Sequence, residues 1–144
     1  MIAHLHRIRK ERLNGDRGFT LTELLVVIVI IGILVAIAIP VFLSQREAAF
    51  ARSAEADVRN AIPAIETYYA EENSYPAGTI TITESGVTGT LPASLKINVS
   101  PGVTLVYSKD AAETTYTLSA THEELDSARA WNYDSADSKI VETP

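Results

Sequence analysis

One carboxylate, Glu23, lies at the entrance of a long apolar segment. It is followed by Leu24–Leu43, a run of twenty residues without a charge, and a short basic segment precedes it. A helix of twenty residues rises about 30 Å, which is the thickness of the hydrocarbon core of a bilayer. This order of features indicates a membrane-inserted precursor rather than a soluble enzyme.

The other residues with catalytic or metal-binding potential form no convincing set. His4 and His6 resemble a metal pair, but no third ligand lies near them in the sequence. Two acidic groups suggest calcium, although acidic clusters in an acidic chain are usually solvated. They comprise Glu123, Glu124 and Asp126 in the first group, and Asp134 and Asp137 in the second. No Ser/His/Asp arrangement is visible, so we expect no enzyme, no cofactor and no metal, with calcium as the alternative.

Charge is segregated along the chain. Residues 1–18 hold five basic and two acidic residues, a net charge of +3, whereas the remainder carries −9. Basic residues just before an apolar run stay on the cytoplasmic side of the membrane. We therefore place the N-terminus in the cytoplasm and everything after Leu43 outside. The acidic body argues against nucleic-acid binding, and the absence of cysteine excludes disulfides and thiolate chemistry.

Four segments follow from the hydropathy pattern. Residues 1–18 are expected to be a removed leader, residues 19–43 a transmembrane and assembly helix, and residues 44–73 its amphipathic continuation. Residues 74–144 are expected to form a loop and a sheet. Gly32 and Pro40 should kink the apolar helix, because glycine and proline weaken helical hydrogen bonding.

The second half of the helix carries an apolar stripe. Its main positions are Val58, Ile62, Ile65 and Tyr69, widened by Ala54, Ala61 and Tyr68. Spacings of three and four residues are typical of one helix face that packs against a core. Pro63 interrupts the stripe, and we expect a kink with continuation, with a true break as the alternative. Asn73 suits a left-handed C-cap, and Pro76 cannot continue the helix.

The C-terminal part has the alternating pattern of strands. Residues 103–108 and 114–120 are expected to form an antiparallel hairpin, residues 130–133 a third strand and residues 139–141 a short edge strand. Residues 77–92 are expected to be a loop. A sheet this small cannot bury a core alone, so the helix should form its other wall. The predicted fold is α+β, with one long helix across an antiparallel sheet.

Residues 17 to about 50 closely resemble the N-terminal signature of type IV pilins and pseudopilins. The resemblance rests on Gly18–Val27, read as GFTLTELLVV, and on Ile31–Pro40, read as IGILVAIAIP. It implies that a prepilin peptidase cuts after Gly18 and that the new amine of Phe19 is methylated. It also implies assembly into a helical filament with the apolar helices at its centre, aided by an inner-membrane assembly platform.

In this family the acid that corresponds to Glu23 faces the amine of a neighbouring subunit's first residue, here Phe19. The physical rationale is that a carboxylate in lipid is costly and a nearby cation offsets the cost. The chain resembles the cysteine-free pilins of Gram-positive bacteria. The resemblance thus implies a membrane protein that becomes part of an extracellular pilus, with adhesion and motility among the possible roles.

Several alternatives stay open. Within the family, the chain could be a type II secretion pseudopilin or a DNA-uptake pilin. From another class, it could be a single-pass membrane-anchored binding module. The segment Ala36–Ala38 also fits the pattern before a signal-peptidase cut, although the helical pattern continues past it.

Overall fold

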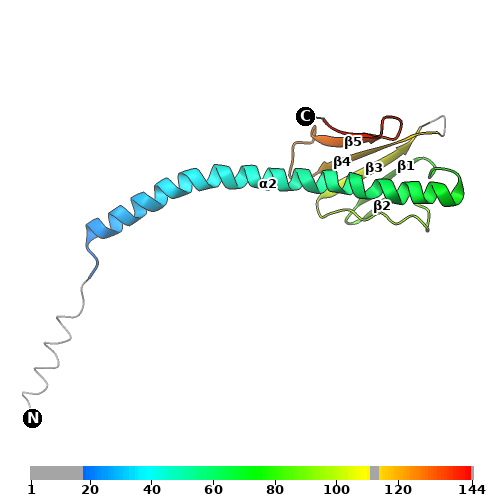
Figure 1. Ribbon diagram of the computed structural model, residues 1–144. Helices are drawn as coiled ribbons and strands as arrows, with labels where there is room; N and C mark the ends of the chain where they lie inside the picture. The colour runs from blue at the N-terminus through cyan, green and yellow to red at the C-terminus, as the bar shows by residue number, and fades with distance from the viewer. Residues whose placement is uncertain (1–17, 111–113, 144) are drawn as a thin grey trace, which may run out of the picture. The chain divides into compact units, whose positions relative to one another are not determined.

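The computed structural model describes residues 18–110 and 114–143 (Figure 1). Of the expected leader, only Gly18 lies among the described residues, so the paired histidines His4 and His6 lie outside them. Residues 111–113, within the expected hairpin turn, also lie outside. The chain divides between Phe42 and Leu43 into two compact units, which are described separately.

A single helix, α2 (Leu21–Glu72), accounts for 52 residues. It is α-helical through Gly32, Pro40 and Pro63, so the predicted continuation past Pro63 is confirmed and the alternative of a break is excluded. Pro63 lies on the exposed side of α2, where water can bond the carbonyl that a proline leaves unpaired. The kinks expected at Gly32 and Pro40 stay predictions.

The helix ends as its sequence predicts. Asn73 has a φ of 53°, in the left-handed region, and its N–H donates to the carbonyl of Tyr69 at 2.8 Å. This bond closes the last turn, and Pro76 follows three residues later. The chain then turns back toward the sheet.

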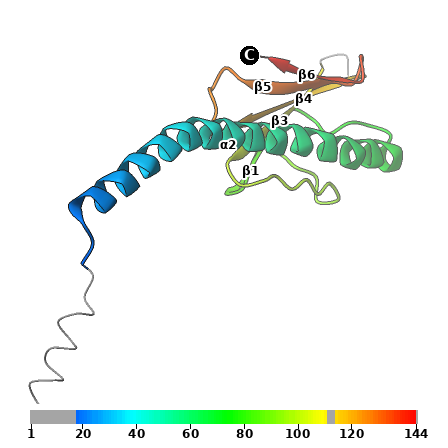
Figure 2. The ribbon, with the colours of Figure 1, turned by 60° about the vertical axis from the view of Figure 1, so that its left-hand side comes forward.

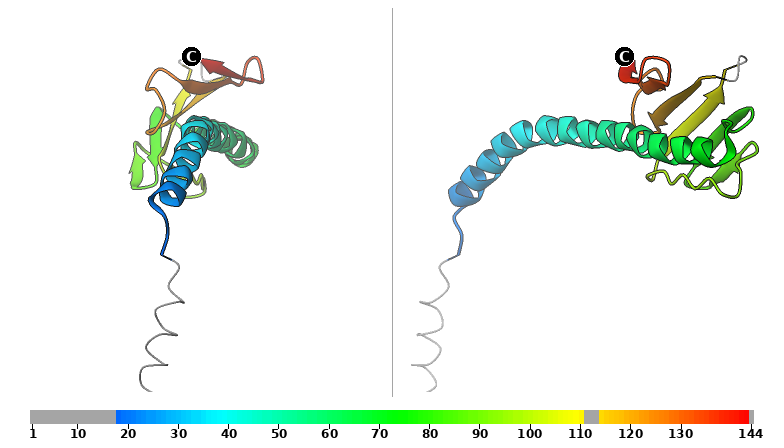
Figure 3. Two further views of the ribbon diagram at one scale, coloured as in Figure 1. Left: turned by 90° about the vertical axis from the view of Figure 1, so that its left-hand side faces the viewer. Right: turned by 45° about the vertical axis from the view of Figure 1, so that its right-hand side comes forward.

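Six antiparallel strands form one sheet in the order β2-β1-β3-β4-β5-β6. They are β1 (Thr79–Thr83), β2 (Gly86–Thr88), β3 (Val103–Lys109), β4 (Tyr116–His122), β5 (Ala130–Asp134) and β6 (Lys139–Thr143). The second half of α2 lies along one face of the sheet (Figures 2 and 3). The α+β architecture, the β3–β4 hairpin and the two C-terminal strands are therefore confirmed.

The expectation of a loop over residues 77–92 is wrong. This segment contains the β1–β2 hairpin, with Thr81 opposite Thr88 and Thr83 opposite Gly86. Strand β1 alternates, and its two isoleucines, Ile80 and Ile82, are buried against the core. The signal was present in the alternation at residues 79–83, but the many hydroxyl and glycine residues favoured a loop interpretation.

The core lies between α2 and the sheet. From the helix, the buried apolar residues are Ala54, Val58, Ala61 and Ile65. From the central strands, they include Leu105, Tyr107, Tyr116, Leu118 and Ala120. The stripe is narrower than predicted at its end, because Tyr69 stays 39% exposed.

One acidic residue, Asp57, is buried between α2 and the sheet, and its burial was not predicted from the sequence. Asp57 is only 4% exposed and accepts two hydrogen bonds from Ser100, at 2.6 Å from the backbone N–H and 3.0 Å from the hydroxyl. Each oxygen of this buried carboxylate thus receives one donor. The contact fastens the chain between β2 and β3 to the helix.

Candidate assembly site at the start of the helix

The first turn of α2 is closed by a reciprocal cap between Thr20 and Glu23. The hydroxyl of Thr20 accepts the N–H of Glu23 at 3.2 Å, and Oε2 of Glu23 accepts the N–H of Thr20 at 2.9 Å. The Thr20 hydroxyl also donates to Oε2, at 2.9 Å. This is a capping box, in which two backbone donors at the helix start are satisfied at once. An acid in the first turn also interacts favourably with the helix dipole.

Sequence reasoning missed the role of Thr20, although its signal was available. A threonine followed three residues later by glutamate, just before an apolar run, is the pattern of a capping box. The consequence is that the Glu23 side chain is oriented by its own chain before any second molecule arrives.

The cap uses one oxygen of the Glu23 carboxylate, Oε2, and leaves Oε1 available as an acceptor. Both Thr20 donors converge on Oε2, and among the described residues no hydrogen bond is made to Oε1 of Glu23. A carboxylate has bonding capacity at both oxygens. Glu23 can therefore keep its cap and accept a further donor at Oε1.

The other predicted site residues are arranged along one exposed segment. Gly18 and Phe19 lie before the helix, and Phe19 is 88% exposed. A side chain built at Gly18 would meet nothing within 4 Å. Gly32 and Pro40 lie within α2 and are exposed as well. Among the described residues, the side-chain hydrogen bonds of Glu23 go to Thr20 and none goes to these four.

Every apolar side chain from Leu21 to Leu43 is exposed. The exposed fractions of the large hydrophobic side chains range from 44% at Val35 to 80% at Leu21. By length and composition this part of α2 is apolar enough to cross a membrane. A helix that is apolar on all sides needs lipid or other apolar helices around it.

A tyrosine cluster holds the far end of α2 against the sheet. The Tyr116 hydroxyl donates to Oε1 of Glu66 at 2.9 Å, and the Tyr107 hydroxyl donates to the carbonyl of Pro76 at 2.9 Å. Burial raises the pKa of both tyrosines well above the usual range, and the neighbouring Glu66 raises that of Tyr116 further. Both hydroxyls therefore stay protonated as donors at neutral pH.

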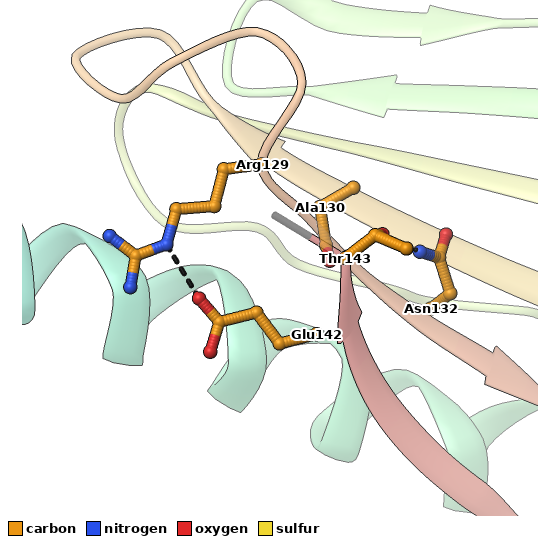
Figure 4. A network of polar contacts seen from close by, with 5 residues as sticks. All are labelled: Arg129, Ala130, Asn132, Glu142 and Thr143. Carbon is orange, nitrogen blue, oxygen red and sulfur yellow. Dashed lines mark hydrogen bonds and ion pairs between the residues drawn. The ribbon is translucent and has the colours of Figure 1, made fainter.

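The last strand is fastened to its neighbour by polar contacts (Figure 4). Arg129 pairs with Glu142 at 2.6 Å, and the Asn132 amide donates to the hydroxyl of Thr143 at 2.6 Å. That hydroxyl also donates to the carbonyl of Ala130, at 3.1 Å. These contacts hold the edge of a sheet in a chain that has no cysteine.

Within residues 18–110 and 114–143, no group of three His, Asp or Glu side chains is placed to hold a metal ion. Of the acidic groups considered for calcium, Glu124 pairs with Arg46 at 3.7 Å. Asp126 and Asp134 each accept a backbone N–H two residues further on. Asp126 and Asp134 therefore stabilise turns.

A family model for the prokaryotic N-terminal methylation motif matches residues 13–39. The matched range includes Gly18, Phe19, Glu23 and Gly32 and stops before Pro40. The chain therefore combines the N-terminal methylation motif with a long apolar helix and an antiparallel sheet, the α+β arrangement of type IV pilins and pseudopilins, which it resembles.

Similar proteins come from both branches of that class. The chain is 36% identical over 87 residues to the type IV wide pilus major component PilA4 of Thermus thermophilus, covering 60% of this chain and 66% of that one. It is 37% identical over 62 residues to the type II secretion system core protein G of Pectobacterium carotovorum, covering 43% and 40%. It is 38% identical over 69 residues to the type IV major pilin protein PilA of Myxococcus xanthus, covering 47% and 31%.

The chain thus spans between 31% and 66% of the length of these curated relatives. All three are named as pilus or secretion-system components. No solved structure matches the chain.

Proposed function

We propose that the chain is a structural subunit of a type IV pilus-like surface filament and that it polymerises through its hydrophobic helix. The observation that carries this proposal is that every apolar side chain from Leu21 to Leu43 is exposed, on a helix that begins with a capped acid at Glu23. Such a surface is suited first to lipid and then to the apolar helices of other copies. No enzymatic role is required of any residue.

Before assembly the chain would span the cytoplasmic membrane once, with its N-terminus in the cytoplasm. A prepilin peptidase would cut between Gly18 and Phe19 and the new amine of Phe19 would be methylated. The exposure of both residues ahead of the helix supports this step, because a protease needs accessible, non-helical backbone. An inner-membrane assembly platform would then transfer the processed subunit to the filament.

In the filament, Glu23 would pair with the Phe19 amine of a neighbouring copy. The cap with Thr20 supports this role, because it orients the carboxylate at the helix start and leaves Oε1 for an external donor. A cation beside a carboxylate in an apolar surround interacts more strongly than the same pair in water. Because one acid and one amine meet per contact, the pairing would also set the axial register of the subunits.

The test compares processing with assembly in cells that carry the peptidase. Glu23→Ala should leave the mature chain starting at Phe19, by mass spectrometry, while removing it from sheared filaments. Glu47→Ala, which removes another exposed acid from the same helix, is the matched control and should assemble normally. Normal filament incorporation of Glu23→Ala would contradict the role of Glu23.

Gly18→Val tests the cleavage position separately. A branched side chain at Gly18 should block access to the scissile bond, so the precursor should accumulate in the membrane with residues 1–18 attached. Unchanged processing would place the cut elsewhere. A wild-type envelope protein that keeps its first 18 residues would instead favour a single-pass anchored binding module.

The similarity to the type II secretion core protein of Pectobacterium supports a second candidate, a pseudopilin that builds a short filament. Electron microscopy of sheared cell surfaces separates the two candidates. Long filaments that contain this chain support the pilus subunit. Loss of protein secretion in a deletion strain that has no such filaments supports the pseudopilin.

A further inference from the structure

The face of the sheet opposite to the core carries a hollow over β4, β5 and β6. Alternation along these strands buries Leu118 and Tyr133 toward α2 and leaves their neighbours on the other face. The hollow has a volume of about 400 Å³. Ligand pockets have volumes of about 300–1,000 Å³, so the space suits a small molecule or one unit of a polymer. The side chains of the outer face that line it are Thr117, Ser119, Asn132, Asp134, Lys139 and Val141.

The strand register arranges these side chains in two rows. Ser119, Asn132 and Val141 form one row, and Thr117, Asp134 and Lys139 form the other. Neighbouring strands are about 4.7–4.9 Å apart, and alternate residues of one strand are about 6.4–6.8 Å apart. The two rows therefore cover about 7 Å by about 10 Å, an area comparable to that of a sugar ring.

Polar groups in both rows have hydrogen-bonding capacity to spare. Nδ2 of Asn132 donates to the hydroxyl of Thr143 at 2.6 Å, and its Oδ1 accepts nothing from the described residues. Oδ1 of Asp134 accepts the N–H of Ala136 at 2.9 Å, whereas Oδ2 accepts nothing from the same part of the chain. Lys139 lies opposite Asp134, yet its ammonium forms no ion pair or hydrogen bond within residues 18–110 and 114–143. Two acceptors and one donor are therefore left for a ligand.

We propose that this hollow, which we call the β4–β6 groove, binds a neutral sugar unit of a polysaccharide. A sugar hydroxyl both donates and accepts hydrogen bonds, so it can donate to Asn132 or Asp134 and accept from Lys139. The C–H groups of the sugar ring pack on Val141, an apolar side chain that is 56% exposed in a mostly polar surface. The groove thus offers both kinds of contact that a sugar needs.

The charges of the groove select against charged polymers. Its lining contains one lysine, Lys139, and two aspartates, Asp134 and Asp137, a net charge of −1. A nucleic acid or another polyanion requires several cations to offset its charge, and the lining offers one. A polycation would be repelled by Lys139. A neutral polymer of hydroxyl groups requires hydrogen bonds and no opposite charge, so it matches this lining.

The test measures retention of the full chain on polysaccharide beads. The chain is kept in micelles of a detergent that has no sugar headgroup, because such a headgroup would compete for the groove. The beads carry cellulose, dextran, mannan or agarose, which are neutral, or alginate, which is anionic. The fluorescence of Trp131, the single tryptophan, measures the protein left in solution and gives the dissociation constant for each polymer.

Three substitutions probe the groove and one serves as the matched control. Lys139→Ala removes the ammonium donor, whereas Lys139→Gln replaces it by a neutral donor. Ser119→Val fills the hollow with a side chain that strands accept well. Lys96→Ala removes another exposed lysine, which lies outside the groove. The emission maximum of the buried Trp131 reports whether each variant is folded.

We expect retention on at least one neutral polymer, weakened at least about tenfold by Lys139→Ala and by Ser119→Val. Lys139→Gln should keep most of the affinity, and Lys96→Ala should keep all of it. Retention on none of the neutral polymers overturns the proposal, and so does stronger retention on alginate. Undiminished binding by folded Ser119→Val places the contact elsewhere and overturns it as well. Filament assembly takes no part in this test, so its outcome is independent of the proposed function.

Discussion

Pro63 lies in the middle of a continuous helix, and its replacement should stabilise the protein. A proline in a helix interior is about 3 kcal/mol less favourable than alanine, because it lacks an N–H and crowds the preceding turn. Proline also restricts the unfolded chain, which returns about 0.4–1 kcal/mol of that difference. Since Pro63 is exposed and α2 already passes through it, Pro63→Ala should raise the free energy of unfolding by about 2 kcal/mol.

For the hundred or so residues from Leu43 onward, 1 kcal/mol corresponds to about 4–8 °C in the unfolding midpoint. Pro63→Ala should therefore raise the midpoint by about 8–16 °C, measured by Trp131 fluorescence of the full chain in detergent micelles. Trp131 is 4% exposed and reports on the core.

Pro76→Ala is the matched control. Pro76 is fully buried after the end of the helix, so replacing its ring by a methyl group removes buried apolar atoms and should lower the midpoint. A midpoint for Pro63→Ala that is unchanged or lower would refute the reasoning. It would mean that the proline ring contributes packing equal to the helical hydrogen bond it prevents.

Two further predictions concern the buried polar contacts. Asp57→Ala leaves the Ser100 N–H without its acceptor, so the free energy of unfolding should fall by about 2–3 kcal/mol in thermal unfolding. Asp57→Asn keeps one acceptor oxygen and should lower it by only about 1 kcal/mol. Equal losses would show that hydrogen bonding to Asp57 is unimportant. The pKa of Tyr107 and Tyr116 is raised in the folded protein, so their contribution to the free energy of unfolding is fully present below about pH 10, where tyrosine ionises in the unfolded chain. This contribution is lost as the pH rises further. Tyrosinate absorbance of these two residues should therefore appear together with the loss of Trp131 fluorescence, and ionisation in the folded protein would contradict this account.

Local and periodic features were predictable from the sequence. The helix from Leu21 to Glu72 follows from the apolar run and the three-and-four spacing after it, and its end follows from Asn73. The β3–β4 hairpin follows from strict alternation. The β1–β2 hairpin was missed because the alternation at residues 79–83 is short and the surrounding threonine, serine and glycine residues favour a loop.

The candidate site was predictable in part. The position of Glu23 relative to Gly18 and the apolar run could be read directly, whereas its hydrogen bonds to Thr20 depend on side-chain geometry within one turn. Asp57 and His122 could not be placed by pattern. The burial of Asp57 depends on Ser100, which lies 43 residues away in the sequence. The burial of His122 depends on Phe50 of the helix, in the opposite layer of the core.

Within the chain, α2 buries only Ala54, Asp57, Val58, Ala61 and Ile65, all in a stretch of twelve residues. Partly buried neighbours such as Ile62 and Tyr68 add to this packing, but residues 21–47 are all exposed. Helices obtain most of their stability from packing, so this first half of α2 depends chiefly on the medium that surrounds it. Any molecule that coats the helix and binds the folded form more strongly than the unfolded form shifts the measured stability by mass action. Unfolding temperatures of this protein should therefore vary with the alkyl-chain length and concentration of the detergent, and values obtained in different detergents are not interchangeable.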